Sequence, residues 1–148
     1  LGNYAAFEKD LVEDVIPYAQ NCYRVSTEQK DRAIAGLSMG GGQALTVGLG
    51  HLELFGWLGA YSSAVPRDQS LDGLLAEPKA INDKLQLFWI GCGQSDFLFQ
   101  ANHKFLERLN AEEIKHVAHI TDGAHEWRLW RVYLNEFVPL LFKAANQD

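Results

Sequence analysis

Short apolar runs alternate with amphipathic stretches of helical length along this chain of 148 residues, and this alternation constrains the fold most. The apolar runs are bounded by turn-forming residues, which is typical of strands buried on both faces. They cover residues 33–37, 55–61, 85–90 and 117–120. The helical stretches cover residues 4–22, about 40–50, 98–109 and 127–141. This order predicts an α/β fold, with a mostly parallel sheet and helices on both faces.

Two segments disturb this pattern. Pro17 lies within the first helical stretch, so we expect it to kink that helix or to end it early. Residues 65–84 contain two prolines and several charged side chains, which predicts a surface excursion with one helical turn near residues 71–76.

Composition argues against several classes of protein. Apolar residues make up 47% and charged residues 22% of the chain, so a folded domain with a real core is expected. Its net charge of −6 disfavours a nucleic-acid surface, and no apolar run is long enough to span a membrane. Two cysteines, Cys22 and Cys92, cannot form a four-ligand zinc site, and we expect Cys92 to be an inert, packed thiol. We expect no metal and no cofactor, because His116 and His119 lie at positions of opposite strand parity and nucleotide motifs are missing.

Residues 36–40 read G-x-S-x-G and join a predicted strand to a predicted helix. This spacing suits a sharp turn that presents the hydroxyl of Ser38, because a Cβ two residues before or after it would clash. The backbone N–H of Met39 would then lie beside the hydroxyl and could bind an oxyanion. The alternative is a glycine-rich helix start in which Ser38 is only the N-cap.

Two further polar residues follow predicted strands. Asp96 comes after the third strand and His125 after the fourth, so parallel strands would bring both to the same sheet edge as Ser38. Taken singly, Asp96 could be a helix cap and His125 a solvated loop residue. The order serine, aspartate, histidine is the one expected of the α/β-hydrolase fold. Asp122, Asp68 and Asp72 are weaker candidates for the acid.

This trio has a chemical reason. A serine hydroxyl is a weak nucleophile at neutral pH, so a base must remove its proton as it attacks an acyl carbon. Histidine can take that proton and return it to the leaving alcohol, and a carboxylate behind the ring fixes its tautomer.

Three segments resemble those of one known family, the esterase D-like α/β-hydrolases, and most of all carbohydrate esterase family 1, which contains feruloyl and acetyl xylan esterases. The segments are residues 31–43 (DRAIAGLSMGGGQ), 89–98 (WIGCGQSDFL) and 123–127 (GAHEW), the last followed by Trp130. Residues 14–18 (DVIPY) are similar to the helix that precedes the nucleophile strand in that family. This resemblance implies that Ser38 is the nucleophile, His125 the base and Asp96 the acid.

The resemblance also implies the substrate class and the extent of the domain. It implies a secreted or periplasmic serine esterase without a cofactor, acting on feruloyl or acetyl esters of plant polysaccharides. Phe97 and Trp127 could supply aromatic surface for a feruloyl ring or a sugar, whereas the helical register of Trp130 favours the core.

Family members carry a further N-terminal half that holds several strands and the second oxyanion donor. Residues 1–148, which open with Leu1 and show no signal peptide, therefore read as a single domain forming the C-terminal portion of a longer catalytic domain. The alternative is a non-catalytic or incomplete domain that self-associates or pairs with the missing N-terminal segment.

Overall fold

The computed structural model describes residues 2–66 and 69–143, and within them it has four strands and seven α-helices. The strands are β1 (Ala33–Leu37), β2 (Trp57–Tyr61), β3 (Leu87–Gly93) and β4 (Val117–Thr121). The helices are α1 (Gly2–Lys9), α2 (Ile16–Cys22), α3 (Met39–Gly50), α4 (Gln69–Leu74), α5 (Pro78–Lys84), α6 (Phe99–Ala111) and α7 (Trp127–Phe137).

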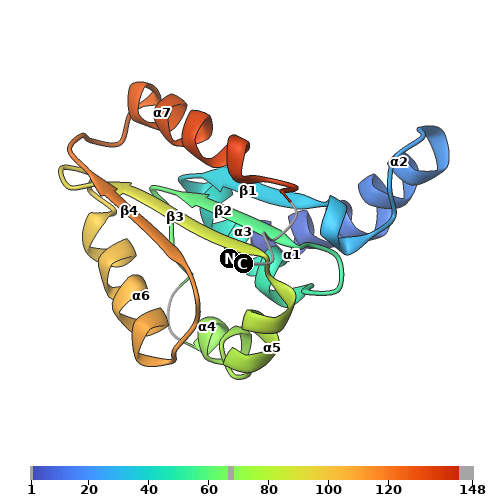
Figure 1. Cartoon of the computed structure of the whole chain (residues 1–148), viewed down its shortest axis with the longest axis horizontal. Coiled ribbons are helices and arrows are strands. Elements are labelled where there is room, and N and C mark those ends of the chain that lie inside the picture. The colour runs from blue at the N-terminus through green and yellow to red at the C-terminus, as the bar shows by residue number, and fades with distance from the viewer. Residues whose placement is uncertain (1, 67–68, 144–148) are drawn as a thin grey trace.

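All strand pairs are parallel and the strands follow chain order, β1-β2-β3-β4. Helix α7 covers one face of the sheet, and α3 to α6 lie on the other (Figure 1). The predicted α/β architecture with helices on both faces is confirmed. Helix α3, the pair α4 and α5, and helix α6 each return the chain to the start of the next parallel strand.

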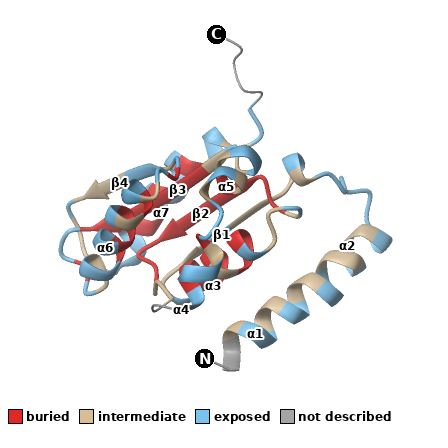
Figure 2. Ribbon diagram, turned by 90° about the horizontal axis from the view of Figure 1, so that it is seen from below, coloured by how far each residue is buried: buried red, intermediate tan, exposed pale blue. Residues whose placement is uncertain are grey.

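Alternate residues of the central strands point into two separate cores. On the α3–α6 face, Leu58 and Ile90 pack among helix residues such as Leu45 and Leu109. On the opposite face, the aromatic side chains of Tyr61, Trp89, Trp130, Tyr133 and Phe137 pack together under α7. The strands β2 and β3 are therefore buried on both faces, as their apolar sequence predicts (Figure 2). The same prediction is wrong for residues 33–37, because β1 is at an edge of this sheet and none of its residues is buried.

Pro17 does not end the first helical run. A π-helical segment, Asp10–Val15, precedes it, and α2 then continues to Cys22. Proline lacks an N–H and its ring crowds the carbonyl four residues earlier, so a wider turn in front of it lets the helix continue. This helical run stands apart from the sheet (Figure 2), and no residue of Asp10–Cys22 is buried.

The prediction for residues 65–84 is wrong in part. This segment forms two short helices, α4 and α5, instead of one turn, and Leu71, Leu75 and Ile81 are buried in the core beneath the sheet. Prolines and charged residues dominate the composition of this segment and therefore suggested a surface excursion. Its few apolar side chains nevertheless lie on the inward side of the helices and pack into the core.

Candidate active site

The turn between β1 and α3 presents Ser38 in a strained backbone conformation. Its φ of 54° and ψ of −119° are rare for a residue with a Cβ. The end of β2 holds the turn, because the Ser38 N–H donates to the Tyr61 carbonyl at 2.9 Å and the Ala64 N–H donates to the Ser38 carbonyl at 2.8 Å. Strain of this kind persists only where neighbouring structure enforces it, and β2 provides that enforcement.

The two glycines of the G-x-S-x-G segment are not equivalent. A Cβ on Gly36 would lie 2.1 Å from the carbonyl oxygen of Gly40, so the doubled-back chain excludes any side chain there. A Cβ on Gly40 would meet nothing within 4 Å. The steric reason predicted for both glycines therefore holds for Gly36 and is wrong for Gly40, where an added Cβ would enter open space.

We expect Gly36→Ala to destabilise the fold by about 1–3 kcal/mol, because overlapping backbone atoms must move apart. Gly40→Ala is the matched control, since its Cβ enters open space and its helical position favours alanine. Thermal unfolding of both variants measures the difference. Equal melting temperatures for the two variants would contradict this account.

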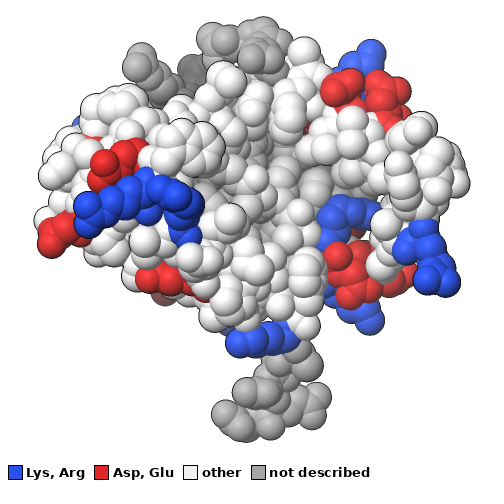
Figure 3. Space-filling model, turned by 90° about the horizontal axis from the view of Figure 1, so that it is seen from above, with Lys and Arg blue, Asp and Glu red and all other residues white. Residues whose placement is uncertain are grey.

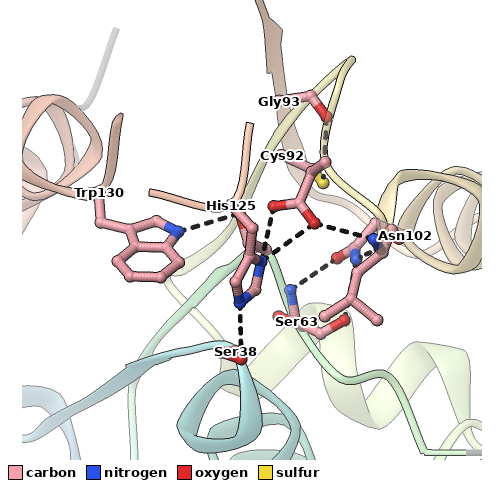
Figure 4. A network of polar contacts seen from close by, with 10 residues as sticks. Ser38, Ser63, Cys92, Gly93, Asn102, His125 and Trp130 are labelled. Atoms are coloured by element: carbon pink, nitrogen blue, oxygen red, sulfur yellow. Dashed lines mark hydrogen bonds and ion pairs between the residues drawn. The ribbon is translucent and has the colours of Figure 1, made fainter. Parts of the chain in front are cut away.

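The three residues Ser38, Asp96 and His125 meet at the carboxyl edge of the sheet. Figure 4 shows the imidazole of His125 pointing at Ser38, with 2.9 Å between Nε2 and Oγ. The other ring nitrogen, Nδ1, lies 3.0 and 2.9 Å from the two carboxylate oxygens of Asp96. The Asp96 side chain is fully buried and also accepts the N–H of Leu98 at 2.8 Å. A buried carboxylate paired with Nδ1 holds Nε2 as the proton acceptor that faces the hydroxyl.

The weaker candidates for the acid lie elsewhere or have other partners. Both carboxylate contacts of the His125 ring go to Asp96, whereas Asp122 is exposed on the following loop. Asp72 forms an ion pair with Arg108 at 2.8 Å on the helical side of the molecule. Asp68 lies outside the described residues. The geometry therefore brings Asp96, and not Asp72, to the histidine.

Trp130 supports the histidine from the side of α7. Its ring contacts the His125 ring edge to face, with centroids 4.8 Å apart, and its Nε1–H donates to the Ser62 hydroxyl at 3.0 Å. Trp130 is buried, as its helical register predicts, yet it also contacts the imidazole. The sequence analysis missed Ser62, which fixes this ring from the end of β2.

Asn102 is a second supporting residue that the sequence analysis missed. Its fully buried amide donates to the carbonyls of Ser63 and Leu98, both at 2.9 Å, and accepts the N–H of Ser63 at 3.2 Å. These bonds join the loop after β2, which holds Ser38, to the loop that carries Asp96 (Figure 4). One signal was available in the sequence, since Asn102 interrupts the apolar stripe that Phe105, Leu106 and Leu109 continue on α6.

The remaining predicted residues lie around this trio. Met39 is the first residue of α3, so its backbone N–H is at a helix N-terminus next to Ser38. Phe97 is 75% exposed, and its ring centroid lies 4.4 Å from that of His125. Trp127 is 67% exposed and contacts Trp130 at 5.3 Å. The roles of these residues in binding stay predictions.

Cys92, the sixth residue of β3, is fully buried near the carboxylate of Asp96. Burial, together with the nearby Asp96 carboxylate, raises the pKa of its thiol to about 12. At pH 8 the thiol is therefore protonated, whereas Cys22 is exposed on α2. We expect iodoacetamide at pH 8 to modify Cys22 alone in the folded protein and both cysteines in denaturant, as measured by peptide mass spectrometry. Equally fast modification of Cys92 in the folded protein would contradict this.

The described part of the chain contains no group of three or more His, Cys, Asp or Glu side chains arranged to hold a metal ion. His116 contacts the Ile114 carbonyl, whereas His119 pairs with Glu136. Among the helices of residues 2–66 and 69–143, none has both the length and the apolar character needed to cross a membrane.

A family model described as "Putative esterase" matches residues 2–141. The chain is 31% identical over 146 residues to an endo-1,4-beta-xylanase/feruloyl esterase of Xylanibacter ruminicola, covering 97% of this chain and 19% of the relative. It is 26% identical to an acetyl esterase of Caldicellulosiruptor saccharolyticus, covering 95% of this chain and 65% of that protein.

Solved structures agree with these matches. The structure of a carbohydrate esterase family 1 ferulic acid esterase from the anaerobic fungus Anaeromyces mucronatus superposes with a TM-score of 0.75 at 25% identity. That match covers 92% of this chain and 53% of the fungal one. The comparisons confirm the resemblance predicted from the sequence, and this chain spans less than two thirds of each of these proteins.

Proposed function

Because this chain belongs to the Esterase family, we propose that it contributes to a serine esterase that hydrolyses carboxylic esters through an acyl-enzyme on Ser38. The observation that carries the proposal is the pair of contacts of His125, whose Nε2 lies 2.9 Å from the Ser38 hydroxyl while Nδ1 contacts Asp96. A serine hydroxyl, an imidazole and a buried carboxylate in this order are the parts that acyl transfer requires.

The proposed reaction has two steps. In the first, Ser38 Oγ attacks the ester carbonyl carbon while His125 Nε2 accepts the hydroxyl proton, and the resulting tetrahedral oxyanion faces the N–H of Met39. The carbon–oxygen bond to the alcohol then breaks as Nε2 returns the proton to the leaving oxygen. In the second step a water molecule attacks the acyl-serine by the same route, which releases the acid and restores the Ser38 hydroxyl.

We propose feruloyl or acetyl esters of plant polysaccharides as the substrates. The names of the relatives support these two acyl groups, one being a feruloyl esterase joined to a xylanase and another an acetyl esterase. The exposed rings of Phe97 and Trp127 lie beside His125 and Trp130, where they can contact part of the substrate. A secreted or periplasmic location, which such substrates suggest, stays a prediction.

Hydrolysis of methyl ferulate and p-nitrophenyl acetate by the full-length protein tests this function. We expect turnover of at least one ester, together with a feruloyl or acetyl mass increment on the peptide that contains Ser38 after rapid acid quenching. Turnover without an adduct on that peptide, or no turnover of either ester, would argue against the proposal.

One feature favours a second candidate, in which residues 1–148 are an incomplete domain that requires a partner. Strand β1 is at the edge of the sheet, is only partly buried, and contains no lysine or proline to guard that edge. Seen from the face that α7 covers, the charged side chains gather at the two sides of the view and leave uncharged surface between them (Figure 3). An unguarded apolar edge strand pairs readily with another strand.

We therefore propose that a further segment completes the sheet along β1 and supplies a second oxyanion donor. Without it we expect residues 1–148 to self-associate, and any esterase activity to be lower by roughly 10² to 10³, the usual effect of losing one such donor. Light scattering of the isolated chain, with ester hydrolysis measured before and after adding the upstream segment, tests both. A soluble monomer with the full activity of the longer protein would overturn this proposal.

A further inference from the structure

We propose that Phe97 binds the alcohol half of the ester, and that this half is a sugar stacked on its ring. This inference rests on the proposed function. It assigns the exposed aromatic surface of the site to the leaving group and not to the acyl group.

The position of the alcohol follows from the proton that His125 must deliver. In the first step, Nε2 takes a proton from Ser38 and gives it to the oxygen of the leaving alcohol. That oxygen must come within about 2.6–3.2 Å of Nε2. The alcohol therefore leaves the tetrahedral carbon beside the imidazole, whereas the oxyanion faces the start of α3.

Phe97 lies against the imidazole ring that must deliver this proton. Its ring centroid lies 4.4 Å from that of His125, with an angle of 50° between the ring planes. Its backbone follows Asp96 directly, so the loop that buries the acid also fixes the ring against the base. A group bonded to the leaving oxygen can therefore contact this ring, whereas the next aromatic residue, Phe99 at the start of α6, packs against His103.

The exposure of Phe97 indicates a binding surface. At 75% exposed, the ring leaves most of its apolar area in water although it lies against the reacting histidine. The C–H faces of a sugar pack well on an aromatic ring, and its hydroxyl groups can remain in water. Trp127 is also exposed and contacts Trp130, which in turn contacts His125. We infer that its ring can bind a second sugar unit of the same substrate.

Two substrates that share an acyl group but differ in the alcohol distinguish binding of the acyl group from binding of the alcohol. We would measure kcat/KM of the full-length protein and its Phe97→Ala variant on methyl ferulate and on a feruloylated arabinose oligosaccharide. We expect the variant to lose roughly 3- to 10-fold on the sugar ester, the size of one lost aromatic contact, and little on methyl ferulate. The rate at which water hydrolyses the feruloyl-enzyme, measured in a single turnover, should be the same in Phe97→Ala, because the alcohol has already left the site at that stage.

Phe99→Ala is the matched control, because it removes a ring two residues further along, at the start of α6, that contacts His103. We expect it to leave the ratio of the two kcat/KM values unchanged. An equal loss on both esters, or slower breakdown of the feruloyl-enzyme, would assign Phe97 to the acyl group and overturn the inference.

A binding measurement separates this inference from the proposed function. We expect the arabinose oligosaccharide without its feruloyl group to bind the Ser38→Ala protein, and Phe97→Ala in that background to weaken binding by a similar factor. Sugar binding that depends on Phe97 without any ester hydrolysis would overturn the proposed function alone. Hydrolysis with no dependence of sugar binding on Phe97 would overturn this inference alone.

Discussion

Ser38→Ala is expected to lower kcat for ester hydrolysis by a factor on the order of 10⁴ to 10⁶ while the protein stays folded. The variant removes the oxygen that lies 2.9 Å from His125 Nε2, so neither the nucleophile nor its proton transfer remains. The turn itself is held by backbone hydrogen bonds to Tyr61 and Ala64, which alanine keeps. Steady-state kinetics and thermal unfolding of the same preparation measure the two effects.

Ser95→Ala is a suitable control, because that exposed serine lies on the loop before Asp96 and its backbone N–H makes the contact to Gly123. It should leave kcat within about twofold, as ordinary surface substitutions do. A fluorophosphonate probe should label Ser38 in active protein. An active preparation in which the probe labels a different residue would reject Ser38 as the nucleophile.

Asp96→Asn is expected to lower kcat by a factor on the order of 10⁴, because an amide in place of the carboxylate favours the wrong tautomer of the histidine. The side chain is fully buried against Nδ1, so solvent cannot replace the lost acceptor. Asp122→Asn, on the next loop and exposed, is the matched control and should change kcat by less than about threefold.

The comparison of these two variants tests which aspartate supports the histidine. A large loss of kcat in Asp122→Asn with normal activity in Asp96→Asn would reverse the assignment. Circular dichroism of both variants ensures that the loss is not one of folding, since Asp96 also accepts the N–H of Leu98.

Local patterns in the sequence were sufficient to predict the parallel sheet and the meeting of Ser38, Asp96 and His125 at one edge of it. The strands come from short runs rich in apolar residues, and such runs alternating with helices of sufficient length have one common solution, the parallel crossover. Parallel strands end at one edge, so residues that follow β1, β3 and β4 had to approach one another. This is why Ser38, Asp96 and His125 could be predicted to meet although up to 87 residues separate them.

What surrounds the trio was decided by tertiary packing. Ser62 looks ordinary in the sequence, and Asn102 is marked only as a polar residue in an apolar stripe. Their partners, Trp130 for Ser62 and Ser63 and Leu98 for Asn102, are visible only in the folded chain. The sequence already favoured Asp96 over Asp122, and the structure adds the reason that Asp96 can hold the imidazole, since its side chain is fully buried against Nδ1. Hydrophobic periodicity records which face of an element is buried, but it does not record which distant side chain that face will contact. The sequence by itself therefore determined the parallel sheet and the edge where Ser38, Asp96 and His125 meet, and only the tertiary structure decided which neighbours hold these three side chains in place.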